Sequence, residues 1–80
     1  MKYQANVDVP VLLLFFTRSE TLKRVFDEVK KARPSRLFLF QDGPRGERDM
    51  AGIEACRAIV ADDQIDWECD VHRNYQVHNL

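Results

Sequence analysis

The residues Arg36-Leu-Phe-Leu-Phe-Gln-Asp-Gly-Pro-Arg-Gly46 decide how the rest of the chain is organised. Four apolar residues in succession, with turn-forming residues behind them, are typical of a β-strand buried on both faces. Asp42 follows this strand, and in open α/β sheets ligands bind beside the carboxyl ends of the strands. Asp42 is therefore a candidate binding residue. Asp-Gly-Pro is also an ordinary turn sequence, in which Gly43 tolerates positive φ, and from these residues alone the two interpretations stand about equal.

A second apolar run, from Val11 to Phe16, predicts another strand buried on both faces. We expect residues 1–9 to be a flexible lead-in to it. Between the two runs, apolar residues recur at intervals of three and four, which predicts an amphipathic helix. This helix should end at Arg33, because the residue before a proline is pushed out of helical geometry. At its start, Thr17 and Glu20 have the spacing of a capping box.

The same helical spacing recurs from Met50 to Val60 and predicts a second helix. Residues 65–72 then alternate strictly, with Ile65, Trp67, Cys69 and Val71 on one face, which predicts a half-exposed edge strand. The element order is therefore β-α-β-α-β. Short right-handed connections make such a sheet parallel, so we expect a Rossmann-like α/β unit with the strand order three, two, one.

Both predicted helices lie on the same face of this sheet, because both connections step in the same direction with the same hand. The opposite face of the first two strands is then apolar and uncovered. The first strand is also an apolar edge, and natural proteins avoid such edges. We expect these 80 residues to be the amino-terminal half of a larger α/β domain, or to be completed by self-association through the strand at 11–16.

Composition excludes several classes of protein. The formal net charge is -1, with charges of both signs interspersed, whereas nucleic-acid-binding proteins have a clustered basic excess. The two cysteines are too few for a disulfide framework. The apolar run at 11–16 is too short to span a bilayer, and no signal peptide opens the chain. We therefore expect a cytoplasmic protein without a membrane segment.

Two loops open on the same rim of the predicted sheet, one at residues 17–19 and one at residues 42–44. The amino end of the first helix faces this rim too, and its free amides suit an anion such as a diphosphate. Arg18 can donate to a phosphate or stack on a base, and Asp42 can accept from ribose hydroxyls or an imide proton. The glycine-rich fingerprint of NAD and P-loop sites is absent after the first strand.

These segments resemble the opening of the GT-A glycosyltransferases. The resemblance rests on Pro10-Val-Leu-Leu-Leu-Phe-Phe-Thr-Arg18, on the helix that ends at Arg33-Pro34, and on Leu37-Phe-Leu-Phe-Gln-Asp-Gly43. It is nearest to the N-acetylglucosaminyltransferases of the family 2 type. The resemblance implies that residues 10–80 form the nucleotide-sugar-binding part of an incomplete GT-A domain. Arg18 and Asp42 would hold uracil and ribose, together with Thr17 and Gly43, and Arg73 would line the same cleft.

The resemblance further implies an enzyme that transfers a sugar from a UDP-sugar to the hydroxyl of a glycan or other acceptor, with a divalent cation, Mn²⁺ or Mg²⁺. In the family, the metal-binding Asp-x-Asp motif follows a fourth strand, and the catalytic base lies further on. No such motif follows an apolar strand here, so we expect neither metal ligands nor catalytic residues in this chain, and no turnover by it alone. The pairs Glu68/Asp70 and Asp62/Asp63 belong to a polar strand face and a helix end. Cys69, His72 and His78 could be imagined as zinc ligands, but their spacing in the sequence matches none of the common structural zinc sites.

Two alternatives remain open. One is a non-catalytic, flavodoxin-like or receiver-like interaction domain, in which Asp42 only ends a turn. A receiver needs an acidic cluster near the end of its first strand, where Thr17-Arg18 has the opposite charge. The other is a different nucleotide-binding α/β enzyme, such as a nucleotidyltransferase. Such enzymes commonly carry a glycine-rich loop after the first strand, and this chain lacks one.

Overall fold

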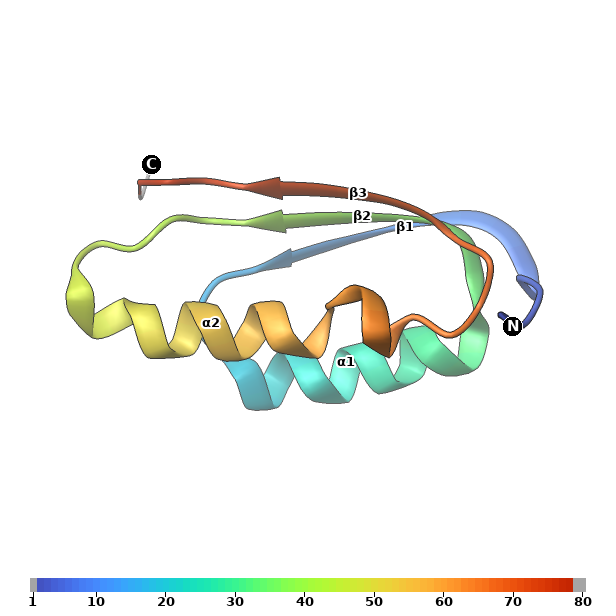
Figure 1. The fold of residues 1–80 in the computed structure, drawn as a ribbon, viewed down its shortest axis with the longest axis horizontal. Helices are drawn as coiled ribbons and strands as arrows, with labels where there is room; N and C mark the ends of the chain where they lie inside the picture. Colours follow the sequence, from blue (N-terminus) through green and yellow to red (C-terminus); the bar gives the residue numbers. More distant parts are fainter. Residues whose placement is uncertain (1, 79–80) are drawn as a thin grey trace.

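The structure, a computed structural model, describes residues 2–78 as a parallel sheet with two helices on one face (Figure 1). The elements are β1 (Val7–Phe15), α1 (Ser19–Ala32), β2 (Pro34–Gln41), the 3-10 helix η1 (Glu47–Asp49), α2 (Met50–Ile59), the 3-10 helix η2 (Asp62–Gln64) and β3 (Asp70–Tyr75). The sheet has the order β1-β2-β3, so that β2 lies in the middle. Both strand pairs are parallel. The α/β class and the parallel sheet are therefore as expected.

Strand β1 begins earlier than the sequence pattern indicated. It starts at Val7 rather than Val11, and the backbone of Tyr3 already bridges to Trp67. The segment 1–9, expected to be a lead-in, thus contains the first residues of a strand. Pro10 lies inside the strand, next to an irregularity in its pairing with β2. A proline is tolerated here because β1 is an edge strand, and the backbone N–H groups on its open side have no neighbouring strand to pair with.

Helix α1 ends as expected but begins differently. Its buried face consists of Leu22, Phe26 and Val29. The capping box predicted for Thr17 and Glu20 is not formed, since Arg18 is the N-cap and no side chain caps the helix. At the other end Arg33 takes the left-handed conformation, with φ 48°, and its N–H donates to the carbonyl of Val29 (2.9 Å). This geometry stops the helix immediately before β2.

Strand β3 covers residues 70–75, whereas the alternating pattern predicted residues 65–72. The assignment of faces was correct, because Ile65 and Trp67 are buried and the alternate acidic residues are exposed. These two side chains, however, pack below the sheet before pairing with β2 begins at Asp70. Alternation reports which side of the chain is buried, and it does not report where the backbone pairs with its neighbour.

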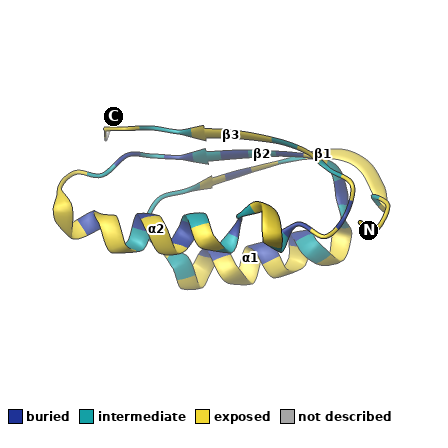
Figure 2. Ribbon diagram, viewed as in Figure 1, coloured by how far each residue is buried: buried dark blue, intermediate teal, exposed yellow. Residues whose placement is uncertain are grey.

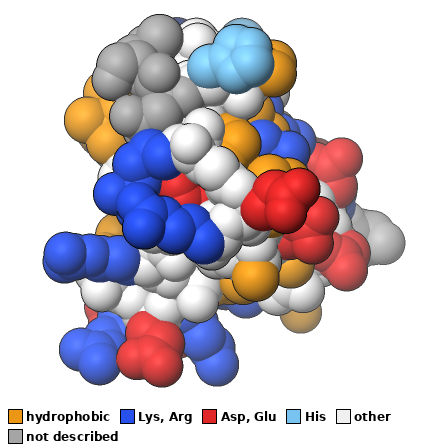
Figure 3. All heavy atoms as spheres, turned by 90° about the vertical axis from the view of Figure 1, so that its left-hand side faces the viewer, with side chains coloured by type: hydrophobic (Ala, Val, Ile, Leu, Met, Phe, Trp, Pro, Cys, Tyr) orange, Lys and Arg blue, Asp and Glu red, His pale blue; other side chains and the backbone are white. Residues whose placement is uncertain are grey.

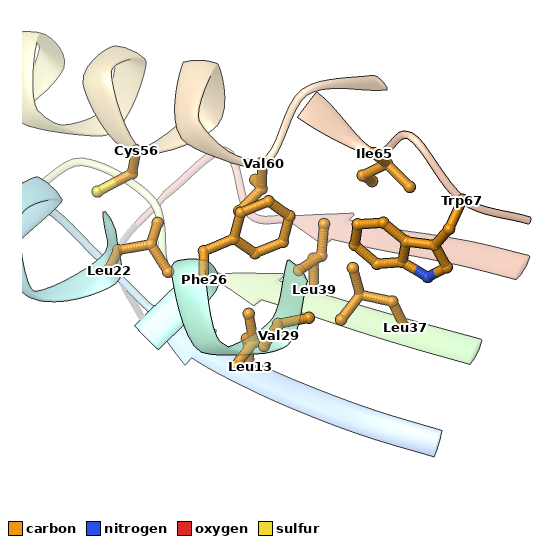
Figure 4. Close-up of a cluster of buried hydrophobic side chains, with 10 residues drawn as sticks. All are labelled: Leu13, Leu22, Phe26, Val29, Leu37, Leu39, Cys56, Val60, Ile65 and Trp67. Atoms are coloured by element: carbon orange, nitrogen blue, oxygen red, sulfur yellow. The ribbon is translucent and has the colours of Figure 1, made fainter. Parts of the chain in front are cut away.

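The core lies between the sheet and the two helices (Figure 4). Trp67 fills the end of this layer, where its indole N–H donates to the carbonyl of Pro34 (2.8 Å). Its ring is tilted 40° to that of Phe26, at 6.5 Å between centroids. The thiol of Cys56, on α2, is fully buried in the same cluster. Burial raises the pKa of this thiol.

The far face of the sheet is uncovered within residues 2–78 (Figure 2). Leu12 and Leu14 of β1 are 61% and 72% exposed, and Phe38 and Phe40 of β2 are only half-buried. The ring of His72 stacks on that of Phe38 at 4.9 Å between centroids. The expectation that both helices occupy one face, and that the apolar residues of the other face lack a layer, is confirmed.

Candidate functional site

A groove of 530 Å³ lies where β1 ends and α1 begins, beside the end of β2. It brings together three of the five residues predicted from the sequence, Thr17, Arg18 and Asp42. The other lining residues are apolar except for Thr21: Leu13, Leu14, Phe15, Phe16, Leu22, Val25 and Phe40. The groove therefore combines an apolar wall with one cation, one carboxylate and two hydroxyl groups.

Thr17 is held in the groove by close packing against α2. A Cβ atom added at Gly52 would lie 2.8 Å from the Cβ of Thr17 and 2.9 Å from its carbonyl oxygen. Gly52 therefore marks a close approach between α2 and the β1–α1 loop. The absence of a side chain at Gly52 lets α2 fix the position of this loop.

Arg18 presents its side chain to solvent at the start of α1. Its carbonyl accepts the N–H of Leu22 (3.0 Å), which places the residue firmly at the N-cap. Its guanidinium makes no hydrogen bond or ion pair with any other residue in the range 2–78. The side chain is thus available to an anionic or aromatic ligand. One acidic residue, Glu20, lies in the first turn of the helix and reduces its positive potential.

Asp42 has a structural contact as well as a place beside the groove. Its backbone N–H donates to the carbonyl of Phe15 (3.3 Å), which ties the end of β2 to the end of β1. Its Oδ1 accepts the N–H of Gly43 (3.0 Å), as in a turn. Asp42 therefore takes part in the turn and also lines the groove, so the two interpretations of this residue are compatible.

Gly43 does not border the groove, and its backbone does not use positive φ. It is buried instead under the segment after β3, where an added Cβ would lie 2.5 Å from the backbone of His78. Only a glycine lets these two backbone segments come so close. Its role is to let the end of β2 pass beneath the chain that follows β3.

Arg73 lies apart from the other predicted site residues. Its guanidinium donates to the carbonyl of Val60 (2.9 Å) and pairs with Asp62 at 2.8 Å. Arg73 sits inside β3, opposite Leu39, and its side chain holds the end of α2. The prediction that it shares a cleft with Arg18 and Asp42 does not agree with this placement. The predicted strand ended at residue 72, and the observed one continues to Tyr75, which moves Arg73 away from the rim.

Sequence reasoning missed a buried carboxylate that shapes the loop after β2. Asp49 accepts two hydrogen bonds from the Arg45 guanidinium (both 3.0 Å) and one from the Arg45 backbone N–H (2.8 Å). These bonds lower the pKa of Asp49 to about 2. The guanidinium of Arg45 also lies over the ring of Phe16, at 5.3 Å from its centroid. The i, i+4 spacing of Arg45 and Asp49 was the signal available in the sequence.

Gln41 is the second residue whose role was missed. It is fully buried, and its amide donates to the carbonyls of Phe16 (2.9 Å) and Ile53 (3.2 Å). Its Oε1 accepts the Nε–H of Arg57 (2.8 Å). Gln41 thus connects β2 to the β1–α1 loop and to α2 at the same time. A single polar residue at the end of an apolar strand is the sequence signal for such a connection, because a buried amide needs partners.

The rim carries charges of both signs (Figure 3). Seen from the side of the strand ends, Lys and Arg side chains gather over the left half of the molecule, and most Asp and Glu side chains lie on the right. Such a division gives an anionic ligand a preferred half of the rim without making the whole surface basic.

Comparison with known proteins adds no assignment: no family model, curated protein or solved structure matches this chain. Among residues 2–78, no three or more His, Cys, Asp or Glu side chains are grouped so that they could hold a metal ion. In the same range, no helix is long and apolar enough to cross a membrane.

Proposed function

We propose that this chain is the nucleotide-recognising part of a GT-A-like glycosyltransferase and that its ligand is a UDP-sugar. The observation that carries the proposal is the groove at the strand ends, which joins Thr17, Arg18 and Asp42 to an apolar wall. A nucleotide needs an apolar surface for its base, acceptors for its ribose and donors for its phosphates. The groove offers each of these within one loop and two strand ends, in the Rossmann-like arrangement that such domains share.

Each group has a defined part in this proposal. The carboxylate of Asp42 accepts from ribose hydroxyls or from the imide of uracil. Arg18 donates to a phosphate or stacks on the base, and the first amides of α1 add donors for the diphosphate. Phe16 and Phe40 supply aromatic surface in the same groove. Gly43 and Arg73 act indirectly, by shaping the loop after β2 and by holding the end of α2.

Sugar transfer itself requires more than these residues supply. The divalent cation expected for such an enzyme finds no ligand set in residues 2–78, so its ligands would have to come from other residues. In the proposal, this chain binds the donor nucleotide, while metal and acceptor are held elsewhere in a longer protein. The free cysteines Cys56 and Cys69 suit a reducing compartment, and a cytoplasmic location belongs to the same proposal.

The test is a titration of the chain with UDP, followed by backbone amide shifts, on wild type and on Asp42→Asn. The asparagine keeps an oxygen that can accept the Gly43 N–H, and it replaces the other carboxylate oxygen by an uncharged NH2 group. We expect shifts at Thr17, Arg18 and Asp42 in the wild type. In Asp42→Asn we expect binding weaker by roughly tenfold, which is the loss of one charge-assisted hydrogen bond.

Asp70→Asn is the matched control, because Asp70 is an exposed carboxylate on the far face of the sheet. Its UDP affinity should equal that of the wild type. Equal affinities for wild type and Asp42→Asn, or shifts confined to other surfaces, would contradict the proposal. The result would favour an interaction domain, in which Asp42 serves only the turn.

A further inference from the structure

Strand β1, at the open edge of the sheet, carries half of the large apolar side chains that residues 2–78 expose. Val7, Val9, Leu12 and Leu14 of β1 are exposed, and Val25 of α1 is exposed where it borders the groove along this edge. Within the described part of the chain, no strand pairs with this side of β1. A nine-residue, mostly apolar edge with unpaired backbone groups is a template for another strand.

We propose that β1 pairs with β1 of a second copy of this chain, antiparallel and about a two-fold axis at Leu13. This inference goes beyond the proposed function and does not depend on it. The register places Leu12 opposite the partner's Leu14, and Leu14 opposite the partner's Leu12, on the uncovered face of the sheet. Cross-strand apolar pairs of this kind stabilise a sheet. Two three-stranded sheets become one continuous sheet, and neither β1 remains an edge.

Charge complementarity selects this register. Asp8 and Arg18 lie five residues to either side of Leu13, so each Asp8 falls at the same end of the pairing as the partner's Arg18. Both side chains are available: the guanidinium of Arg18 has no partner within residues 2–78, and Asp8 accepts one hydrogen bond, from the Ser35 hydroxyl (2.6 Å). Pairing by the two-fold operation joins both ends with opposite charges.

A neighbouring register fails on two counts. With the axis at Leu12, Leu14 would lie opposite the partner's Pro10, and Asp8 opposite the partner's Phe16. The charges would lose their partners, and the proline would face the middle of the apolar stripe. With the axis at Leu13, Pro10 instead lies at the end of the paired segment, where a missing N–H has least effect.

The first experiment is sedimentation equilibrium on the whole 80-residue chain, without nucleotide, from micromolar to near-millimolar concentration. We expect a mass of twice 9.4 kDa at the upper end, and a single monomer–dimer equilibrium. Leu14→Lys should keep the circular dichroism of the wild type and sediment as a monomer. Val77→Lys is its matched control, because Val77 is 75% exposed and lies outside β1, and it should dimerise like the wild type.

Charge reversal tests the register. Asp8→Arg and Arg18→Asp each place like charges at both ends of the pairing, and each should raise the dissociation constant about tenfold. The double variant restores opposite charges and should recover most of the wild-type affinity. A wild-type chain that stays monomeric, a series of larger species, or single reversals without effect would each overturn the proposal. So would a double variant no better than the two single ones, since a merely local effect of either residue would not be rescued.

Discussion

Gln41 is the residue on which most of the rim depends. Its amide group bonds to two carbonyls and to Arg57, all in segments that meet at the strand ends. In Gln41→Leu, the leucine side chain is similar in size to glutamine but cannot donate a hydrogen bond. The carbonyls of Phe16 and Ile53 are then buried without this donor. We expect the free energy of unfolding to fall by about 1–3 kcal/mol, measured by urea denaturation.

Gln76→Leu is the matched control for this change. The side chain of Gln76 donates to Asn74 at the surface, and its backbone N–H, which the substitution keeps, donates to the carbonyl of Gln41 (2.9 Å). Loss of the side-chain bond should cost less than about 0.5 kcal/mol. Equal stabilities of Gln41→Leu and the wild type would show that the hydrogen bonds of Gln41 are replaceable by packing.

Asp49 gives the protein a defined response to acid. Its pKa is lowered from 3.8 to about 2 by the hydrogen bonds from Arg45, so the folded state binds protons less readily than the unfolded chain. The contribution of Asp49 to stability is therefore complete above about pH 4 and is lost as the pH falls toward 2. Urea midpoints measured from pH 5 to pH 2 should fall more steeply for the wild type than for Asp49→Asn. Parallel curves would contradict this assignment.

At the scale of elements, the contact between α2 and the β1–α1 loop is the tightest constraint on the groove. Gly52→Ala improves helix propensity by about 1 kcal/mol, but its Cβ would lie 2.8 Å from that of Thr17. We expect overpacking to prevail, with a net loss of up to about 2 kcal/mol in unfolding free energy and a shifted Thr17 amide resonance.

Gly46→Ala provides the comparison for Gly52→Ala, because an added Cβ at Gly46 has nothing within 4 Å. It should be neutral or slightly stabilising in the same denaturation experiment. A Gly52→Ala protein that is more stable than the wild type would show that α2 can move away from the loop without cost.

The helices and strands could be predicted from the spacing of apolar residues in the sequence, but the residues at which the strands begin and end could not. The buried faces of α1 and β2 follow directly from spacing, because burial repeats with the pitch of each element. The ends of β1 and β3 depend on what lies beside them. Val7 joins β1 because β2 begins opposite it, at Pro34, and β3 begins only at Asp70, where β2 offers a partner at Arg36. Such pairings join residues distant in sequence, which no local pattern records.

The candidate site divides in the same way. Thr17, Arg18 and Asp42 could be placed together because loops after parallel strands share one rim. Arg73 could not, since its position depended on where β3 begins. The roles of Gln41 and Asp49 had only weak signals in the sequence: the i, i+4 spacing of Arg45 and Asp49, and a single polar residue at the end of an apolar strand.

At the scale of the whole molecule, residues 2–78 form two layers, the sheet and the helices on one of its faces. The apolar residues on the other face of the sheet are suited to a third layer. The apolar side chains of β1 and β2 face both the helices and the open side of the sheet. The proposed dimer covers the open edge of β1, and a longer domain would cover the face as well. The dimer places the partner's Asp8 near Arg18, which also lines the groove at the strand ends.

The most direct test of the central claim, that a nucleotide lies in this groove, is a set of intermolecular nuclear Overhauser effects between UDP and the chain. We predict contacts from the H5 and H6 protons of uracil to the rings of Phe16 or Phe40, and from ribose protons to the vicinity of Asp42. Contacts to Phe38 and His72 on the far face, or to the polar hollow beside Asn6 and Arg33, would contradict the account.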